Sequence, residues 1–303
     1  MPTIGVSSLR HRRSSANAAS AVAALVLSVW TSPGLAQTQK TTPPPSSACR
    51  LEPFAAGQVA AVLDGRSFRL TDGREVRLYG IDVPPMPGPD RPRVSAGNSE
   101  TALPPRPDGG LAAAAALAAL IGENEVTLKH LRPASDRYGR LLAEAFVARE
   151  GAEVAVGRAL VAQGFARVAA RSGDAGCRAE LLAAERVARG AKLGLWGDPR
   201  YESRRAENPA EVLAERGRFT LVEGKVVSVR ESGATIYVNF GRRWDQDFTV
   251  TIAKRNERLF AAAGIEPRKL SGRRVVVRGW IEQRGGPWIE AAGPEQIEIL
   301  AER

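Results

Sequence analysis

The chain has 303 residues, of which 43 are Lys or Arg and 33 are Asp or Glu, so its formal net charge is +10. The length suggests two domains of ordinary size, each able to bury a core. With only 2 cysteines and 2 histidines, the chain has no ligand cluster with the spacing of a structural zinc site. The positive charge favours anionic partners such as nucleic acid but selects no function by itself.

The first 36 residues have the pattern of a secretory signal peptide. Three arginines precede an uncharged apolar stretch over 18–30, and small residues follow up to Ala36. The apolar stretch is shorter than the roughly 20 residues that a membrane span needs. We therefore expect residues 1–36 to be cleaved off on export, so that the mature protein is periplasmic or secreted; an uncleaved N-terminal anchor is the alternative.

Residues 37–50 are rich in Pro, Ser and Thr and hold few apolar side chains, which predicts an extended tether. The two cysteines, Cys49 and Cys177, are far apart in the sequence. In an oxidising compartment such a pair favours one disulfide, which would close a long loop and stabilise the fold by roughly 4 to 5 kcal/mol in the chain-entropy model. We predict this disulfide, with two unpaired buried thiols as the alternative.

The segment 51–200 predicts a small antiparallel sheet followed by helices. Alternating runs on either side of Asp72 and Gly73 are typical of a β-hairpin. The eight prolines of residues 84–107 predict a long surface loop. Propensity and spacing then favour a helix, two strands and two more helices, at 111–121, 125–130, 141–147, 154–163 and 177–188.

Residues 201–216 are charged and interrupted by Pro209, which is typical of a linker with some helix. From 217 to 303 the pattern predicts five strands with a helix after the third. The expected strands cover 219–230, 235–240, 247–253, 273–281 and 288–290, and the helix covers 255–263. Because this order is typical of a small OB-type barrel, we predict a mainly β protein with helices, of the α+β class, built from two small barrels.

Five short segments occur in a fixed order within residues 51–200. They are VLDGRSFRL at 62–70, EVRLYGIDVP at 75–84, DRYGR at 136–140, RALVAQGFA at 158–166 and a stretch from 184 to 196 that ends in LW. In this order they resemble the staphylococcal nuclease (thermonuclease) family. The resemblance implies that family's OB barrel for residues 51–200 and, as its reaction, calcium-assisted hydrolysis of phosphodiester bonds.

The resemblance also assigns site residues. Arg77 and Arg140 fall on the family's two phosphate-binding arginines, a role that suits the rigid fork of donors on a guanidinium. Asp82 falls on one of the family's calcium-binding acids, and Tyr138 on a tyrosine beside the bound phosphate. Without a ligand to hold, the two arginines would be surface charges or structural partners of Asp82 or Asp136.

Two residues depart from the family pattern. Arg66 stands where the family's Asp-Gly-Asp-Thr run supplies its second calcium-binding acid, and Pro85 stands where it supplies the glutamate that positions or deprotonates water. Calcium needs several oxygen ligands, and the loss of a general base typically costs about a hundred- to ten-thousand-fold in rate. The departures therefore predict a degenerate site. Calcium is expected as a cofactor only if the protein is an active nuclease. Acids that could restore activity from other positions are Asp72, Glu75, Asp90 and Glu100.

The second predicted barrel combines aromatic with basic side chains. Its aromatic residues at 237, 240, 244 and 248 lie among Arg242, Arg243 and Lys254, the mixture with which single-strand binders stack bases in a basic groove. Aromatic residues at strand spacing are also typical of a core. Trp244, beside an expected turn, is therefore the best candidate for an exposed contact.

These observations favour an exported protein that binds single-stranded DNA or RNA, another phosphate-rich ligand or a cell-envelope partner through a degenerate thermonuclease domain. One alternative is an active calcium-dependent phosphodiesterase that uses relocated acids. Another is a structural cell-envelope protein with no anionic ligand. Salt-dependent nucleic-acid binding separates the first from the third, because neutralising phosphates releases counterions. Metal-dependent turnover identifies the second.

Overall fold

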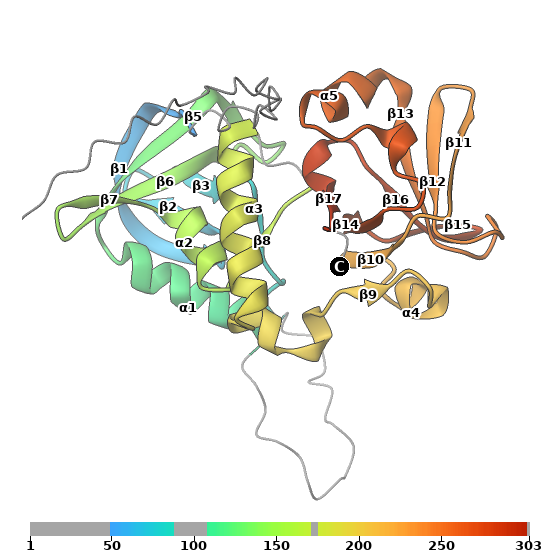
Figure 1. Cartoon of the computed structure of the whole chain (residues 1–303). Helices are drawn as coiled ribbons and strands as arrows, with labels where there is room; N and C mark the ends of the chain where they lie inside the picture. Colours follow the sequence, from blue (N-terminus) through green and yellow to red (C-terminus); the bar gives the residue numbers. More distant parts are fainter. Residues whose placement is uncertain (1–48, 88–107, 171–174, 302–303) are drawn as a thin grey trace, which may run out of the picture. The chain divides into compact units, whose positions relative to one another are not determined.

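The computed structural model describes residues 49–87, 108–170 and 175–301, which fall in one compact unit, Pro45–Arg303. Strands predominate and helices pack against them (Figure 1), so the predicted class, mainly β with helices, is confirmed. The expected signal peptide, almost all of the tether, most of the proline-rich loop and the candidate acids Asp90 and Glu100 lie outside the described residues. Among the residues that are described, no helix is long and apolar enough to cross a membrane.

The N-terminal strands form a six-stranded sheet in the order β3-β2-β1-β5-β6-β7, which a further pairing of β3 with β6 closes. They are β1 (Glu52–Asp64), β2 (Ser67–Leu70), β3 (Glu75–Leu78), β5 (Glu125–Ser135), β6 (Leu141–Arg149) and β7 (Ala152–Ala155). The predicted hairpin is β2–β3, whose turn contains Gly73 at φ 88°, a conformation that favours glycine. Two short strands, β4 (Ile81–Asp82) and β8 (Arg167–Val168), pair separately.

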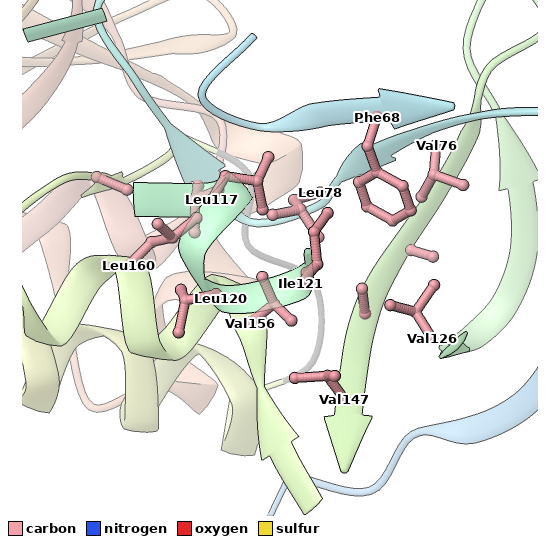
Figure 2. Close-up of a cluster of buried hydrophobic side chains, with 14 of the residues drawn as sticks. Phe68, Val76, Leu78, Leu117, Leu120, Ile121, Val126, Val147, Val156 and Leu160 are labelled. Carbon is pink, nitrogen blue, oxygen red and sulfur yellow. The ribbon is translucent and has the colours of Figure 1, made fainter. Parts of the chain in front are cut away.

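Helices α1 (Gly109–Ile121), α2 (Val156–Ala162) and α3 (Ala175–Gly190) form close to their expected ranges, although the first residues expected in the second helix belong to β7. Asp108 caps α1, because its Oδ1 accepts a hydrogen bond from the Gly110 N–H at 2.9 Å. Figure 2 shows apolar side chains of the strands, α1 and α2 meeting in one core, where Phe68, Leu117 and Leu160 are buried. This core holds the strands that carry the candidate site.

The predicted disulfide between Cys49 and Cys177 is present. It joins the chain just before β1 to α3 over a sequence separation of 128. The backbone N–H of Cys49 also donates to Oε1 of Glu180 on α3 at 3.1 Å. One covalent bond and one hydrogen bond therefore attach the start of the first strand to this helix.

The C-terminal strands form two sheets, β17-β14-β10-β9 and β11-β12-β13-β16-β15. The elements are β9 (Arg204–Arg205), α4 (Pro209–Ala214), β10 (Phe219–Lys225), β11 (Ser228–Ser232), β12 (Thr235–Asn239), β13 (Thr249–Ala253), α5 (Glu257–Ala262), β14 (Arg274–Trp280), β15 (Glu282–Arg284), β16 (Gly286–Glu290) and β17 (Ile297–Ile299). The first expected strand divides into β10 and β11 because the Val226 N–H donates to Arg273, whereas the Val227 N–H donates to Asn239. The OB-type assignment of this region stays a prediction.

Residues 204–214, part of the segment expected to be a linker, pack with the C-terminal strands. Strand β9 pairs in parallel with β10, and Ala206 and Val212 are buried in the C-terminal core. Local composition did not indicate this packing, because the partners of β9 and α4 follow later in the chain.

A buried ion pair joins α3 to β14. The side chains of Arg278 and Glu185 are fully buried, with Nη1 and Oε2 2.6 Å apart. Glu185 Oε1 also accepts a hydrogen bond from the Val168 N–H at 2.7 Å, and Arg278 Nη1 donates to the Val168 carbonyl at 3.3 Å. A small apolar cluster also contains residues of both the N-terminal and the C-terminal elements, among them Trp196 and Leu221. The N-terminal and C-terminal elements therefore share buried contacts.

Candidate functional site

The pairing of β3 with β6 brings the two expected phosphate-binding arginines together. Arg77 on β3 is in register with Leu142 on β6, and Arg140 precedes Leu142 by two residues, close enough for its charge to act on Arg77. Arg66 precedes β2, in which Ser67 is in register with Arg77. Burial lowers the pKa of the Arg77 guanidinium and the positive charges of Arg66 and Arg140 lower it further, while the carboxylates of Asp64 and Asp136 act in the opposite direction. The three arginines thus form a cluster of positive charge, called here the arginine cluster.

The members of the arginine cluster differ in their partners. Arg140 pairs with Asp136, whose Oδ2 accepts from Arg140 Nε at 2.8 Å and lies 2.6 Å from Nη2. The other oxygen of Asp136 accepts from the N–H groups of Tyr138 and Arg140, so the turn holds its own arginine in place. Arg77 forms neither a hydrogen bond nor an ion pair with any described residue. The half-buried guanidinium of Arg77 therefore has no hydrogen-bond or ion-pair partner among the described residues, whereas Arg66 and Arg140 are each held by a carboxylate.

Asp82 is buried and its two oxygens contact two arginines. Arg66 Nη1 lies 3.3 Å from Oδ1 and also donates to the Ile81 carbonyl at 3.1 Å. Arg167 Nη2 donates to Oδ2 at 2.8 Å, since Asp82 and Arg167 are cross-strand neighbours in β4 and β8. Arg167 also donates to the carbonyl of Phe219 at the start of β10 at 3.0 Å. Asp82 thus serves as the shared partner of two guanidinium groups.

This arrangement does not fit a calcium ion. Calcium takes six to eight oxygen ligands, whereas both oxygens of Asp82 already neutralise arginines. Within the described part of the chain, no group of three or more His, Cys, Asp and Glu side chains could hold a metal ion. Arg66 places a positive charge against the one family acid that remains. Asp82 is therefore paired with two arginines rather than open to a metal ion.

Pro85 is exposed beside the start of α1 and offers no group that could accept a proton. Of the substitute acids, Asp72 pairs with Arg74 and Glu75 with Arg69, both on the exposed hairpin. Neither acid contacts the arginine cluster through a hydrogen bond or ion pair. Neither Asp72 nor Glu75 thus takes over the role of the missing glutamate through a contact with the cluster.

Arg167 is the functional residue that sequence reasoning missed. It follows the 158–166 segment by one position, and its partner Asp82 is distant in the chain. Strands β4 and β8 have two residues each, too few for an alternating pattern to reveal their pairing. In the sequence, Arg167 is visible only as a basic residue directly after the matched segment, and that position does not indicate its partner.

Tyr138 and Trp244 are both strongly exposed, at 68% and 74%. The guanidinium groups of Arg137 and Arg140 lie 4.8 and 5.2 Å from the centre of the Tyr138 ring, so this ring borders the arginine cluster. Trp244 lies in the loop between β12 and β13, far along the chain from the cluster. The aromatic residues Phe240 and Phe248, by contrast, are buried in the C-terminal core.

Comparison with protein families finds that residues 75–198 match the family described as Staphylococcal nuclease homologue. The matched range contains Arg77, Asp82, Pro85 and Arg140, while Arg66 precedes it. No curated protein matches the chain. The family match supports the resemblance for this range, and the C-terminal strands lie beyond it.

Proposed function

We propose that the nuclease-like part of this protein binds the phosphate groups of single-stranded nucleic acid, or of another phosphate-rich ligand, without cleaving them efficiently. The observation that carries the proposal is the free guanidinium of Arg77 between Arg66 and Arg140. Arg66 and Arg140 each have a carboxylate partner, whereas Arg77 has none in direct contact. A phosphate anion beside Arg77 would relieve the repulsion between its charge and those of the other two arginines. A phosphate that binds Arg77 would therefore not have to displace a carboxylate from that side chain.

The geometry also supports tight positioning of the anion. Asp136 fixes Arg140 before any ligand arrives, so less conformational entropy is lost on binding. Guanidinium groups form paired, charge-assisted hydrogen bonds with phosphate oxygens. The ring of Tyr138 is 68% exposed although Arg137 and Arg140 lie against it, so its remaining surface could contact a base next to the phosphate.

Efficient hydrolysis lacks two of its usual requirements here. A phosphodiester needs a cation or an equivalent to neutralise developing charge and a group to orient or deprotonate the water. Arginines can stabilise charge, but Pro85 cannot accept a proton, and Asp82 is engaged by Arg66 and Arg167. We therefore propose that the protein retains phosphate binding and lacks efficient phosphodiester hydrolysis.

Further parts of the proposal concern the organisation of the chain. We propose residues 1–36 as a signal peptide for export, a thermonuclease-like domain over 51–200 and an OB-type domain over 217–303. The disulfide supports export, because such bonds persist in oxidising compartments. The strand order of the C-terminal sheets, with α5 after β13, supports an OB-type barrel.

The test is binding of a labelled single-stranded DNA and an RNA of equal length by the chain without residues 1–36, measured by fluorescence anisotropy. Arg77→Ala should weaken binding roughly ten- to a hundred-fold, the usual worth of a hydrogen bond to a charged group, and lower the salt slope by about 0.7. The control is Arg69→Ala, an exposed arginine of the same sheet that pairs with Glu75. Arg69→Ala should change the affinity and the salt slope little.

Other outcomes identify the alternatives. Equal losses in the two variants would show that binding is nonspecific, and no binding at any salt concentration would favour a structural envelope protein. Cleavage of either polymer by the native chain, abolished by a chelator, would establish the calcium-dependent phosphodiesterase instead.

A further inference from the structure

The C-terminal region contains a second candidate site, separate from the arginine cluster. A pocket of about 390 Å³ opens on the sheet β11-β12-β13-β16-β15. The side chains used below are Tyr237, Trp244, Thr251, Arg284, Trp288 and Glu290. Ile236 and Val238, the neighbours of Tyr237 along β12, are buried in the core, so the pocket lies on the opposite face of the sheet.

The floor of the pocket is a fixed aromatic surface. The rings of Tyr237 and Trp288 pack edge to face with centroids 6.0 Å apart. The guanidinium of Arg284 lies over Trp288 at 5.0 Å from its ring centre, and Trp288 is only 9% exposed. Trp244 adds a wall from the β12–β13 loop and keeps most of its surface accessible. A ligand ring entering the pocket therefore meets the packed rings of Tyr237 and Trp288 and the exposed ring of Trp244.

The charged side chains at the pocket are paired with one another. Arg284 lies 3.1 Å from Glu282 and 3.7 Å from Glu290, and the side chains of all three remain about half exposed. The lining itself contains one positive and one negative side chain. A phosphate chain would meet two carboxylates, and a cationic ligand would find the face of Trp288 already covered by Arg284. The pocket favours a neutral ligand that carries both hydrogen-bond donors and acceptors.

We propose that this pocket binds a neutral hydroxylated ring, that is, a saccharide unit. The C–H face of the ring would pack on Trp244 and Tyr237, since aromatic faces offer large apolar area. Its hydroxyl groups would donate to Glu290 and accept from Arg284, with the hydroxyl of Thr251 as a further partner. The pocket volume falls at the small end of the roughly 300–1,000 Å³ usual for small ligands, which suits one or two rings.

The test uses the chain without residues 1–36 and three soluble tetrasaccharides, the tetramers of N-acetylglucosamine, of β-1,4-linked glucose and of α-1,4-linked glucose, with calorimetry as the readout. At least one should bind, with an affinity that does not change between low and high salt. Trp244→Ala should weaken binding roughly tenfold, and Glu290→Gln should weaken it several-fold. Trp280→Ala, which removes an exposed tryptophan outside the pocket, should leave it unchanged.

Failure of all three tetrasaccharides to bind the native chain would overturn the proposal. So would competition by a ten-residue oligothymidylate that depends on Trp244 and weakens with salt, because it would make the pocket a base-stacking site. Arg77→Ala should leave saccharide binding intact, so this proposal and the phosphate-binding proposal fail or succeed separately. Because Trp244 is exposed, its substitution should not change the melting temperature.

Discussion

Arg66 supplies a fixed positive charge beside Asp82, where the resembling family places a second calcium-binding acid. Its guanidinium contacts the Asp82 carboxylate and the Ile81 carbonyl, and it is mostly buried. The charge is part of the chain and needs no ion from solution. Phosphate binding at the arginine cluster should accordingly be the same with calcium and with chelator.

Exchanging this one side chain should create an affinity for calcium. In Arg66→Asp, a second carboxylate would stand near Asp82, whose Oδ1 would lose its guanidinium partner. Calcium at ten times the dissociation constant should then raise the free energy of unfolding by about 1.4 kcal/mol. Thermal unfolding with and without calcium measures this, with Arg66→Ala as the control that removes the arginine and adds no acid. A native protein that responds as strongly as Arg66→Asp would contradict the geometry.

Glu144 on β6 predicts a pH dependence of stability. Burial raises the pKa of its carboxyl from 4.5 to about 8, although a hydrogen bond from the Gly157 N–H and the charge of Arg158 act in the opposite direction. The folded state therefore binds more protons than the unfolded state between these two values, and the free energy of unfolding falls as pH rises through that window.

The neutral variant Glu144→Gln should lack this pH dependence, because its amide oxygen can still accept from Gly157 and cannot titrate. Urea unfolding at pH 5 and pH 8 measures the difference. The native protein should lose more stability over this interval than the variant. Equal losses in both proteins would show that Glu144 titrates near its ordinary pKa.

At the scale of elements, the start of α1 is fitted closely against the segment that carries Pro85. A Cβ on Gly110 would collide with the carbonyl oxygen of Pro85 and lie 2.9 Å from the Met86 nitrogen. Gly110→Ala should therefore lower the free energy of unfolding by about 1–3 kcal/mol, as overpacking usually does. The matched control is Gly190→Ala at the end of α3, where a Cβ would meet open space. It should be neutral or stabilising by up to about 1 kcal/mol, and chemical denaturation of both variants decides the point.

Short-range patterns predicted most elements because the information lies within each segment. The Asp72-Gly73 turn indicated the β2–β3 hairpin, helix propensity indicated α1, and helical spacing indicated α3. The division between β10 and β11 was not predicted, because it depends on bonds from Val226 and Val227 to strands later in the chain. The family resemblance indicated Arg77 and Arg140, because both lie in segments that match the family. It did not indicate that Arg167 pairs with Asp82, because that pairing depends on two very short strands far apart in the chain.

At the scale of the whole molecule, the pair Arg278–Glu185 ties α3 to β14 in a fully buried setting. Removing Glu185 would leave Arg278 charged and fully buried, with only the more distant Glu298 carboxylate at 3.7 Å as an acidic partner. Glu185→Ala should therefore lower the free energy of unfolding by about 3–5 kcal/mol. The double variant Glu185→Leu with Arg278→Met should lose less than the sum of the single losses, because neither charge then remains. Urea unfolding of Glu185→Ala, Glu185→Leu, Arg278→Met and the double variant tests this, and additive losses would show that the two side chains act independently.

The disulfide has a consequence for proteolysis. Cys49 and Cys177 lie on either side of every residue of the arginine cluster, and of Asp82 and Pro85. A protease that cuts once anywhere between the two cysteines therefore produces two polypeptides that stay covalently joined. On a denaturing gel the nicked protein should migrate as one species until a reductant separates it into two fragments. A nick in this interval would leave both halves of the site attached to each other in an oxidising environment.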